Sequence, residues 1–155
     1  MSSAARSAWL ERSSWLRRNR RLLTEAMRLA LRAEIDLRVL PFTHVLARLN
    51  AQPRPGERPP ECLQIAGVYR AVRWAYRLLP LSSTCLKTSL VFCDMLTRRG
   101  VRAELRIGVM KTSAGVASHA WVEDDLGATL TDPLAGFFPL PLSRPHSPIV
   151  SPDGL

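Results

Sequence analysis

The chain has 155 residues, and its 22 lysine and arginine residues against 13 acids give a net charge of +9. This length is typical of one domain, and 46% apolar residues are enough to build a core, which excludes a wholly disordered chain. No apolar run approaches the roughly 20 residues of a membrane-spanning helix, so we expect no transmembrane segment. Three cysteines without a C-x-x-C pair exclude a disulfide framework and a four-cysteine zinc site. We therefore expect a protein of a reducing compartment, with no metal or other cofactor.

The positive charge comes almost entirely from 20 arginines, and nine of them lie within the first 39 residues. Such an excess is typical either of a surface for an acidic partner or of an arginine-rich composition on solvated helix faces. Basic residues interleaved with exposed aromatics, or a docking motif, would indicate nucleic-acid binding, and the sequence has neither. Arginines also interrupt every candidate signal sequence near the N-terminus. We expect a cytoplasmic protein that does not bind nucleic acid.

Four segments have apolar residues at intervals of three or four, which is the spacing of one helix face. The predicted helices cover residues 15–39, 42–49, 61–79 and 85–99. The apolar stripe of the first helix is expected to face the core and consists of Leu16, Leu23, Met27, Ala30, Leu31, Ile35 and Val39. Four prolines and a glycine predict a loop over residues 51–60.

After Gly100 the pattern changes to an alternation of apolar and polar residues, which is the period of a β-strand. The predicted strands cover residues 101–109, 117–123 and 128–132. Helices first and strands last predict an α+β fold with a small antiparallel sheet rather than alternating βαβ units.

The same patterns predict one domain over residues 15–132, with a helical part at 15–99 and a sheet part at 101–132. Residues 1–14 are expected to form a flexible N-terminus. Residues 133–155 are rich in proline and are expected to form an irregular tail.

Cys85 is the candidate nucleophile. A cysteine attacks as its thiolate, and the N–H groups at the start of a helix favour that anion. Cys85 follows three residues with capping-type hydroxyls and begins a predicted helix. The alternative is a buried structural thiol, which is the commonest role of a free cysteine. Cys62 and Cys93, in the middle of helical stretches, fit that structural role.

His119 is the candidate general base among three histidines. His44 falls in a short apolar helix, and His146 falls in the proline-rich tail without a scaffold to hold it. His119 lies in the middle of a predicted strand, and rigid sheet is what positioned catalysis needs. The alternative is a structural histidine whose ring is hydrogen-bonded within the core.

Asp132 is the candidate that would orient the imidazole of His119. If the hairpin turns at residues 125–126, His119 and Asp132 lie directly opposite and share one face. Glu123 shares that face but lies roughly 13 Å further along the strand, and Asp124 points to the opposite face. The alternative is that Asp132 only ends a strand.

A thiol at a helix start, a histidine on a following strand and a carboxylate opposite it form a papain-type arrangement. The backbone N–H of Cys85 would supply one donor to the oxyanion. Ser83 and Thr84 are nearby candidates for the second donor, which the sequence does not identify.

Several motifs in order resemble one known family. They are Cys85-Leu86-Lys87-Thr88-Ser89-Leu90, Arg98-Arg99-Gly100, Leu105-Arg106-Ile107-Gly108-Val109, His119-Ala120-Trp121-Val122-Glu123 and Asp132. The family is that of the lasso-peptide maturation leader peptidases, the stand-alone transglutaminase-like B-type proteins of split systems. The resemblance covers residues 61–133 well and residues 20–50 loosely.

The resemblance implies a transglutaminase- or papain-like fold and a cysteine protease that removes the leader from a ribosomally made lasso precursor. Cys85 would attack the scissile carbonyl, His119 would shuttle the proton, and Asp132 would orient His119. The implied partners are the precursor peptide, a separate small leader-binding protein and an ATP-dependent cyclase.

Two other readings stay open. The same three residues could transfer an acyl group to an amine, as transglutaminases do, because the sequence does not say whether water or an amine accepts it. The chain could also be a non-catalytic adaptor that docks a partner through its basic N-terminal helix.

We expect Arg17, Arg18 and Arg21 to dock the leader-binding partner or the leader, with Trp9 and Trp15 as anchors of that interface. Packing of this helix on the protein's own core is the alternative, and attachment to a membrane surface is a weaker one.

Overall fold

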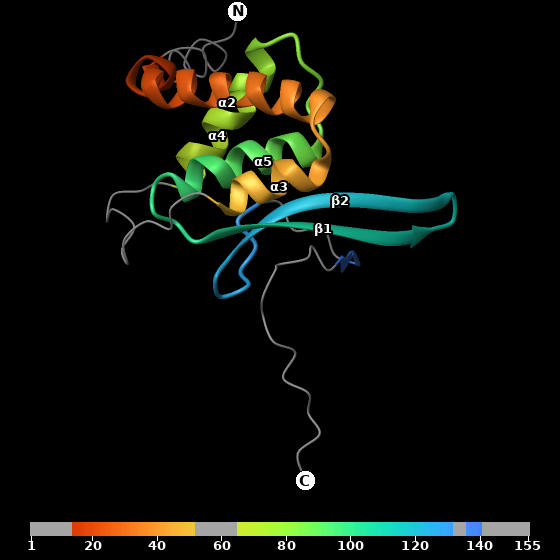
Figure 1. Cartoon of the computed structure of the whole chain (residues 1–155). Helices are drawn as coiled ribbons and strands as arrows, with labels where there is room; N and C mark the ends of the chain where they lie inside the picture. Colours follow the sequence, from red (N-terminus) through yellow and green to blue (C-terminus); the bar gives the residue numbers. More distant parts are fainter. Residues whose placement is uncertain (1–13, 52–64, 132–135, 141–155) are drawn as a thin grey trace, which may run out of the picture.

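A computed structural model describes residues 14–51, 65–131 and 136–140, with helices gathered on one side of a three-stranded antiparallel sheet (Figure 1). A helical segment over residues 14–18 precedes the first labelled helix. The elements are α2 (Arg20–Val39), α3 (Phe42–Asn50), α4 (Ile65–Leu78), α5 (Cys85–Thr97), β1 (Ala103–Thr112), β2 (Gly115–Asp124) and β3 (Phe138–Pro139). The predicted α+β class, with helices before strands, is confirmed.

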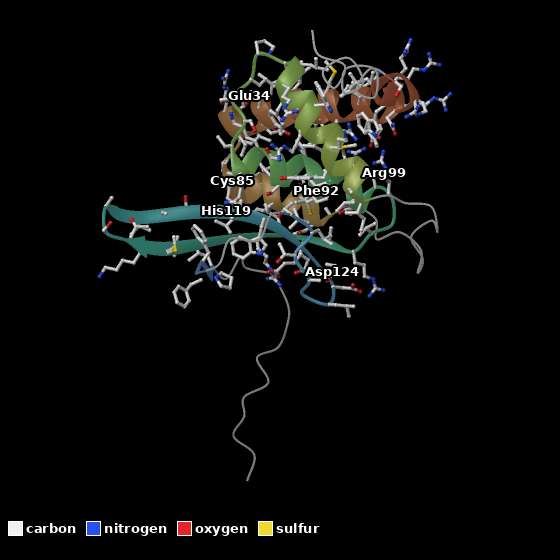
Figure 2. The ribbon with its side chains drawn as sticks, turned by 180° about the vertical axis from the view of Figure 1, so that it is seen from behind. Glu34, Cys85, Phe92, Arg99, His119 and Asp124 are labelled. Carbon is white, nitrogen blue, oxygen red and sulfur yellow. The ribbon has the colours of Figure 1, made fainter. Side chains whose placement is uncertain are left out.

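Helix α5 forms the centre of the molecule. It packs on β1 and β2, while α2 and α4 cover its other side (Figure 1). Phe92 and Met95 are completely buried, and Figure 2 shows Phe92 between the helices and the sheet. Gly100 follows the helix at φ 89, a left-handed conformation that glycine adopts without strain, and turns the chain into β1. The position of α5 therefore links the helical layer to the sheet.

The outer face of α2 corrects one prediction. Leu31, Ile35 and Val39 are 44%, 61% and 72% exposed, although the helical spacing predicted that they face the core. The buried face instead carries Ala26 and Ala30, whose small side chains let neighbouring helices approach closely. The predicted stripe is right at Leu23, Met27 and Ala30, which pack in or against the core, and wrong for its C-terminal part.

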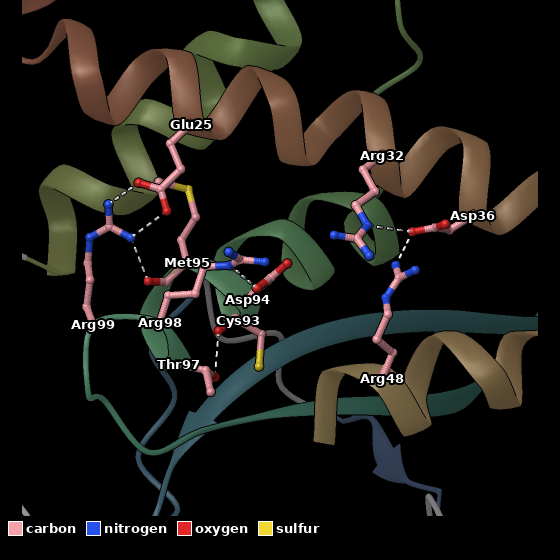
Figure 3. Close-up of polar contacts among 10 residues, drawn as sticks. All are labelled: Glu25, Arg32, Asp36, Arg48, Cys93, Asp94, Met95, Thr97, Arg98 and Arg99. Atoms are coloured by element: carbon pink, nitrogen blue, oxygen red, sulfur yellow. Dashed lines mark hydrogen bonds and ion pairs between the residues drawn. The ribbon is translucent and has the colours of Figure 1, made fainter. Parts of the chain in front are cut away.

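Ion pairs attach the acids of α2 to other elements. Glu25 pairs with Arg99, which also donates to the Met95 carbonyl, and Asp36 pairs with Arg48 and Arg32 (Figure 3). The hydrogen bond from Arg48 holds the pKa of Asp36 below its ordinary value. These pairs turn carboxylates inward on a helix whose exposed side carries arginines.

The sheet has the order β2-β1-β3, so β2 is an outer strand. Strands β1 and β2 form a hairpin in which Thr112 pairs with Gly115 across a two-residue turn. β3 pairs with the other side of β1, where Val109 lies opposite Phe138. β3 falls in the region predicted to be an irregular tail, so that part of the prediction is wrong.

The predicted third strand over residues 128–132 is also wrong for the residues that the structure describes there. Residues 128–131 form only one isolated bridge, between Glu123 and Thr129. The predicted register would instead join Glu123 to Ala128. The turn explains the shift. The Asp124 carboxylate accepts hydrogen bonds from the N–H groups of Leu126 and Ala128, and the turn that they close is one residue longer than the predicted one.

The predicted boundaries of the two terminal segments lie mostly outside the described residues. The expected flexible N-terminus lies outside the described residues except for Ser14, and so do residues 141–155 of the expected tail. Among the described residues, no helix combines the length and the apolar character needed to cross a membrane.

Candidate active site

A pocket of about 290 Å³ lies where α4, the start of α5 and β2 meet. Cys85 and His119 both line it, and Figure 2 shows Cys85 at the start of α5 beside His119 on β2. The other lining residues are Tyr69, Arg73, Ser83, Thr84, Thr88, Ser89, Ala120 and Thr131. Among these described residues there is no acid, one arginine and several hydroxyls. The lining therefore contains nothing that would repel a negative charge on sulfur.

Cys85 is the first residue of α5, is exposed and forms no disulfide. Thr84 caps the helix: its backbone is extended, and its hydroxyl accepts a hydrogen bond from the Lys87 N–H at 3.3 Å. Cys85 therefore lies in the first turn of a capped helix, at the positive end of the helix dipole. The predicted placement of Cys85 at a helix start is what the structure has.

The backbone N–H of Cys85 has no acceptor within the helix because it belongs to the first turn. Its role as an oxyanion donor stays a prediction. Of the two candidates for a second donor, Thr84 is engaged as the cap, and Ser83 Oγ lies 3.4 Å from Thr88 Oγ1. Both line the pocket.

Lys87 ties the start of α5 to α2. Its Nζ donates to Ser82 Oγ at 2.9 Å and lies 2.7 Å from Glu34 Oε2, and both charged side chains are largely buried. The hydrogen bond with Lys87 holds the pKa of Glu34 below its ordinary value. This contact fixes the loop that leads into Cys85, because Ser82 lies only three residues before it.

His119 lies on the outer strand of the sheet. It stacks on Trp121 with ring centroids 6.1 Å apart, and its ring lies 5.5 Å from that of Phe137. These contacts put His119 on the face opposite Ala120, which is buried toward the helices. His119 and Ala120 lie on opposite faces of β2, yet both line the pocket. The pocket therefore extends around the outer edge of this strand. Cys85 and His119 share it without a hydrogen bond between them.

Gly108 makes room for this arrangement. It pairs with His119 across the ladder, and a Cβ at this position would come within 2.7 Å of the Trp121 ring. The Trp121 indole is also held from its other end, because its Nε1 donates to Glu123 Oε1 at 2.7 Å. The absence of a side chain at Gly108 therefore allows Trp121 to lie across β1 and support His119.

Ser89 joins the two halves of the site. Its hydroxyl is buried and donates to the Ala120 carbonyl at 3.0 Å. Ser89 lies one helical turn after Cys85, and Ala120 directly follows His119, so one hydrogen bond connects the helix of the cysteine to the strand of the histidine. The sequence patterns did not predict this role, although a spacing of four residues places Ser89 on the same helix face as Cys85.

The carboxylate that would orient His119 is not among the described residues, because Asp132 lies outside them. The register that placed Asp132 opposite His119 is off by one residue at the Glu123–Thr129 bridge. Glu123 is occupied by Arg106, whose Nε donates to it at 2.9 Å, as well as by Trp121. The sequence also did not predict the contact of His119 with Phe137, which lies outside the predicted domain.

The remaining cysteines and histidines lie elsewhere. Cys93 is buried, as predicted, while His44 is exposed on α3. Cys62 and His146 fall outside the described residues. Within the described ranges, no three His, Cys, Asp or Glu side chains gather closely enough to hold a metal ion.

The N-terminal arginines predicted to dock a partner are exposed, whereas Trp15 is not a free anchor. Arg17, Arg18 and Arg21 all face solvent. Trp15 packs against the core, and the guanidinium of Arg70 covers its ring at 4.8 Å. Trp9 lies outside the described residues.

Comparison with protein families matches residues 27–140 to the transglutaminase-like superfamily. No curated protein and no solved structure matches the chain. The match spans well over half of the sequence and includes both Cys85 and His119. The chain therefore belongs to the transglutaminase-like superfamily, whose members include cysteine peptidases and acyltransferases.

Proposed function

We propose that this chain is a cysteine peptidase that removes the leader from a ribosomally made lasso-peptide precursor. The observation that carries the proposal is the shared pocket of Cys85, at the N-terminus of α5, and His119, on β2. Membership of a superfamily with cysteine peptidases supports the reaction class. The motifs around Cys85 and His119, which resemble those of lasso leader peptidases, support the choice of substrate.

The reaction would run through an acyl-enzyme. The Cys85 sulfur attacks the carbonyl carbon at the leader–core junction, and the backbone N–H of Cys85 donates to the oxyanion that forms. His119 takes the proton of the Cys85 thiol and gives it to the leaving amine of the core peptide as the carbon–nitrogen bond breaks. Water then attacks the thioester, which releases the leader as a carboxylate and returns the thiol. Asp132 would orient His119 during both steps.

Exposed arginines support a role for the N-terminal helix in docking. Arg17, Arg18 and Arg21 face solvent, while the acids of α2 turn inward to partners on other elements. The surface at this end is therefore basic, without nearby exposed carboxylates on α2 to weaken it. Its partner would be the small leader-binding protein, which brings the precursor to the pocket, and a separate ATP-dependent cyclase would take the released core.

The test combines three components: this protein, a lasso-peptide precursor and a small leader-binding protein. Mass spectrometry should detect a free leader carboxylate and a free core amine, and Cys85→Ala should abolish both. Undiminished cleavage by Cys85→Ala would refute the proposal. A product with a new amide in place of the leader carboxylate would show acyl transfer to an amine instead.

An adaptor role makes a different prediction in cells. If the protein only docks partners, cells carrying Cys85→Ala should still mature the peptide, whereas peptidase activity requires that they fail. Charge reversal at Arg17, Arg18 and Arg21 should weaken binding of the leader-binding protein, most strongly at low salt. Unchanged affinity at low salt would contradict the electrostatic docking.

A further inference from the structure

Strand β2 has a free outer edge over most of its length. β1 occupies its other side, and among the described residues only its last part contacts another segment on the outer side. There, Glu123 bridges to Thr129, and the Leu130 N–H donates to the Val122 carbonyl at 2.8 Å. From Gly115 to Trp121, no strand in the described ranges pairs with this edge. The hairpin end that carries Gly115 reaches past the helices (Figure 1).

The bonds at the paired end identify which backbone groups point outward. The N–H and C=O of Val122 both bond on the outer side, to Thr131 and Leu130, and the Ala120 carbonyl accepts from Ser89. Because outward and inward residues alternate in an antiparallel pair, the backbone groups of Ser118 and Val116 also point outward. The two-residue turn between Thr112 and Gly115 gives the same alternation.

Within the part of the chain that the structure describes, this edge lacks the features that usually protect outer strands. Proteins block such edges with lysine, proline, bulges or a covering element, because unpaired N–H and C=O groups readily pair with another strand. The segment Gly115-Val116-Ala117-Ser118 has no charge and no proline, its pairing with β1 is continuous, and Val116 is 75% exposed. An unprotected edge of this kind is suited to accept an added strand.

The free edge leads directly into the pocket. Ser118 is followed by His119 and Ala120, which line it together with Cys85. An extended chain paired with Val116 and Ser118 would reach the pocket within two residues, or roughly 7 Å along the strand. The Ala120 carbonyl already accepts a hydrogen bond from the Ser89 hydroxyl and is not available to an added strand. The pairing would therefore end before Ala120, next to the pocket that Cys85 lines.

We propose that the substrate binds as an added β-strand on the outer edge of β2, with its backbone paired to Val116 and Ser118 next to the scissile bond. The inference rests on the proposed peptidase function and adds how the peptide is held. An added strand is bound through hydrogen bonds to its backbone rather than through its side chains. The ligand class is therefore an extended, unstructured polypeptide. This mode would let the pocket present the scissile carbonyl to Cys85 in a defined register.

The first experiment measures binding without cleavage. Hydrogen–deuterium exchange of Cys85→Ala, with the precursor peptide and its leader-binding protein, should slow exchange at the amides of Val116 and Ser118. Cleavage by the wild-type protein without any such protection would overturn the strand addition while leaving the peptidase intact. Protection without cleavage would support strand addition and refute the peptidase.

The second experiment probes the register from the peptide side. Precursors are N-methylated at one residue at a time along the stretch beside the cut and assayed with wild-type protein. Loss of one pairing hydrogen bond should raise KM about tenfold. Because alternate residues face β2, the increase should recur at every second position, and the intervening positions are the matched controls. A uniform or absent effect would overturn the proposal.

A protein variant tests the same edge. Ser118→Pro removes an outward N–H, which outer strands tolerate, and should raise KM about tenfold. Alkylation of Cys85 by iodoacetamide should keep its rate, since this reagent needs no strand pairing. An unchanged KM with Ser118→Pro would contradict the proposal. So would sedimentation showing a dimer that already protects these amides, because the edge would then serve a second copy of the chain.

Discussion

Helix α5 carries two cysteines eight residues apart whose surroundings differ completely. Cys85 begins the helix, faces solvent and lines a pocket with a histidine. Cys93 is 1% exposed and its sulfur lies 3.4 Å from the Ala103 carbonyl, to which it donates. Burial raises the pKa of Cys93 to about 12. Position along one helix thus separates a thiol suited to attack from one that only fills the core.

The contrast has two physical sources. At its start the helix offers unpaired N–H groups, which favour an anion, whereas in its middle all such groups are used. The start of α5 also lies at the open edge of the sheet, while its middle lies under α2 and α4. The same helix therefore exposes one thiol at its start and buries the other in the core.

The largest expected effect comes from substituting alanine for each of the two cysteines and measuring peptide cleavage. Cys85→Ala should reduce cleavage at least about a thousandfold, because no other group replaces the nucleophile. Cys93→Ala should keep most of the activity but lower the free energy of unfolding by about 1–2 kcal/mol, since it leaves a small cavity. Mass spectrometry of the products and thermal unfolding of both variants measure the two effects. Equal losses of activity would break the contrast.

Removal of the imidazole comes next. His119→Ala should slow cleavage about a hundredfold or more, the usual contribution of a positioned acid–base group. It should also slow alkylation of Cys85 by iodoacetamide if the imidazole assists the thiolate. His44→Ala is the matched control, because His44 is exposed on α3 and does not line the pocket. Similar rates for both histidine variants would remove His119 from the site.

Ser89 should act through position rather than contact with substrate. Ser89→Ala leaves the Ala120 carbonyl without its donor and should lower the free energy of unfolding by about 1–3 kcal/mol. Because the bond joins the helix of Cys85 to the strand of His119, kcat should fall about tenfold while KM changes little. Ser89→Thr, which keeps the hydroxyl, should recover part of kcat. A loss of stability without any change in kcat would make Ser89 structural only.

The buried thiol should produce a stability change at high pH. Folding holds the pKa of Cys93 at about 12, above its ordinary value of 9.0, so the unfolded chain loses this proton first. Stability is therefore complete below pH 9.0 and falls as pH rises toward 12, by up to about 1.4 kcal/mol per pH unit. Cys93→Ala should lack this contribution. Denaturant unfolding at several pH values compares the slopes, and identical slopes would contradict the prediction.

The smallest effect concerns the contact that holds the loop before Cys85. Lys87 keeps the pKa of Glu34 below its ordinary 4.5, so the stability from this pair is present above pH 4.5 and is lost as pH falls below it. Glu34→Gln should show a shallower loss in acid than the wild-type protein. Unfolding measured between pH 5 and 3 tests this, and an unchanged acid slope would mean that the pair contributes nothing.

Much of the fold follows from local patterns. The spacing of apolar residues predicted all four labelled helices, with bounds that differ by up to five residues from those of the structure. Alternation predicted β1 and β2 with bounds that differ by up to three residues. Local patterns failed where packing or turn geometry decides. Exposed Ile35 resembles a core residue by spacing alone, and the Asp124 turn moved the register by one residue. The two-residue strand β3 has too few residues for any period.

The sequence by itself determined the order of elements, the start of a helix at Cys85 and the strand that carries His119, because capping and periodicity act over a few neighbouring residues. Only the tertiary structure decided that these two residues share one pocket, that Ser89 bonds to Ala120, and that no other described strand pairs with the outer edge of β2 beside them. Those contacts join residues some 30 positions apart. They depend on how α5 lies across the sheet, which no local pattern encodes.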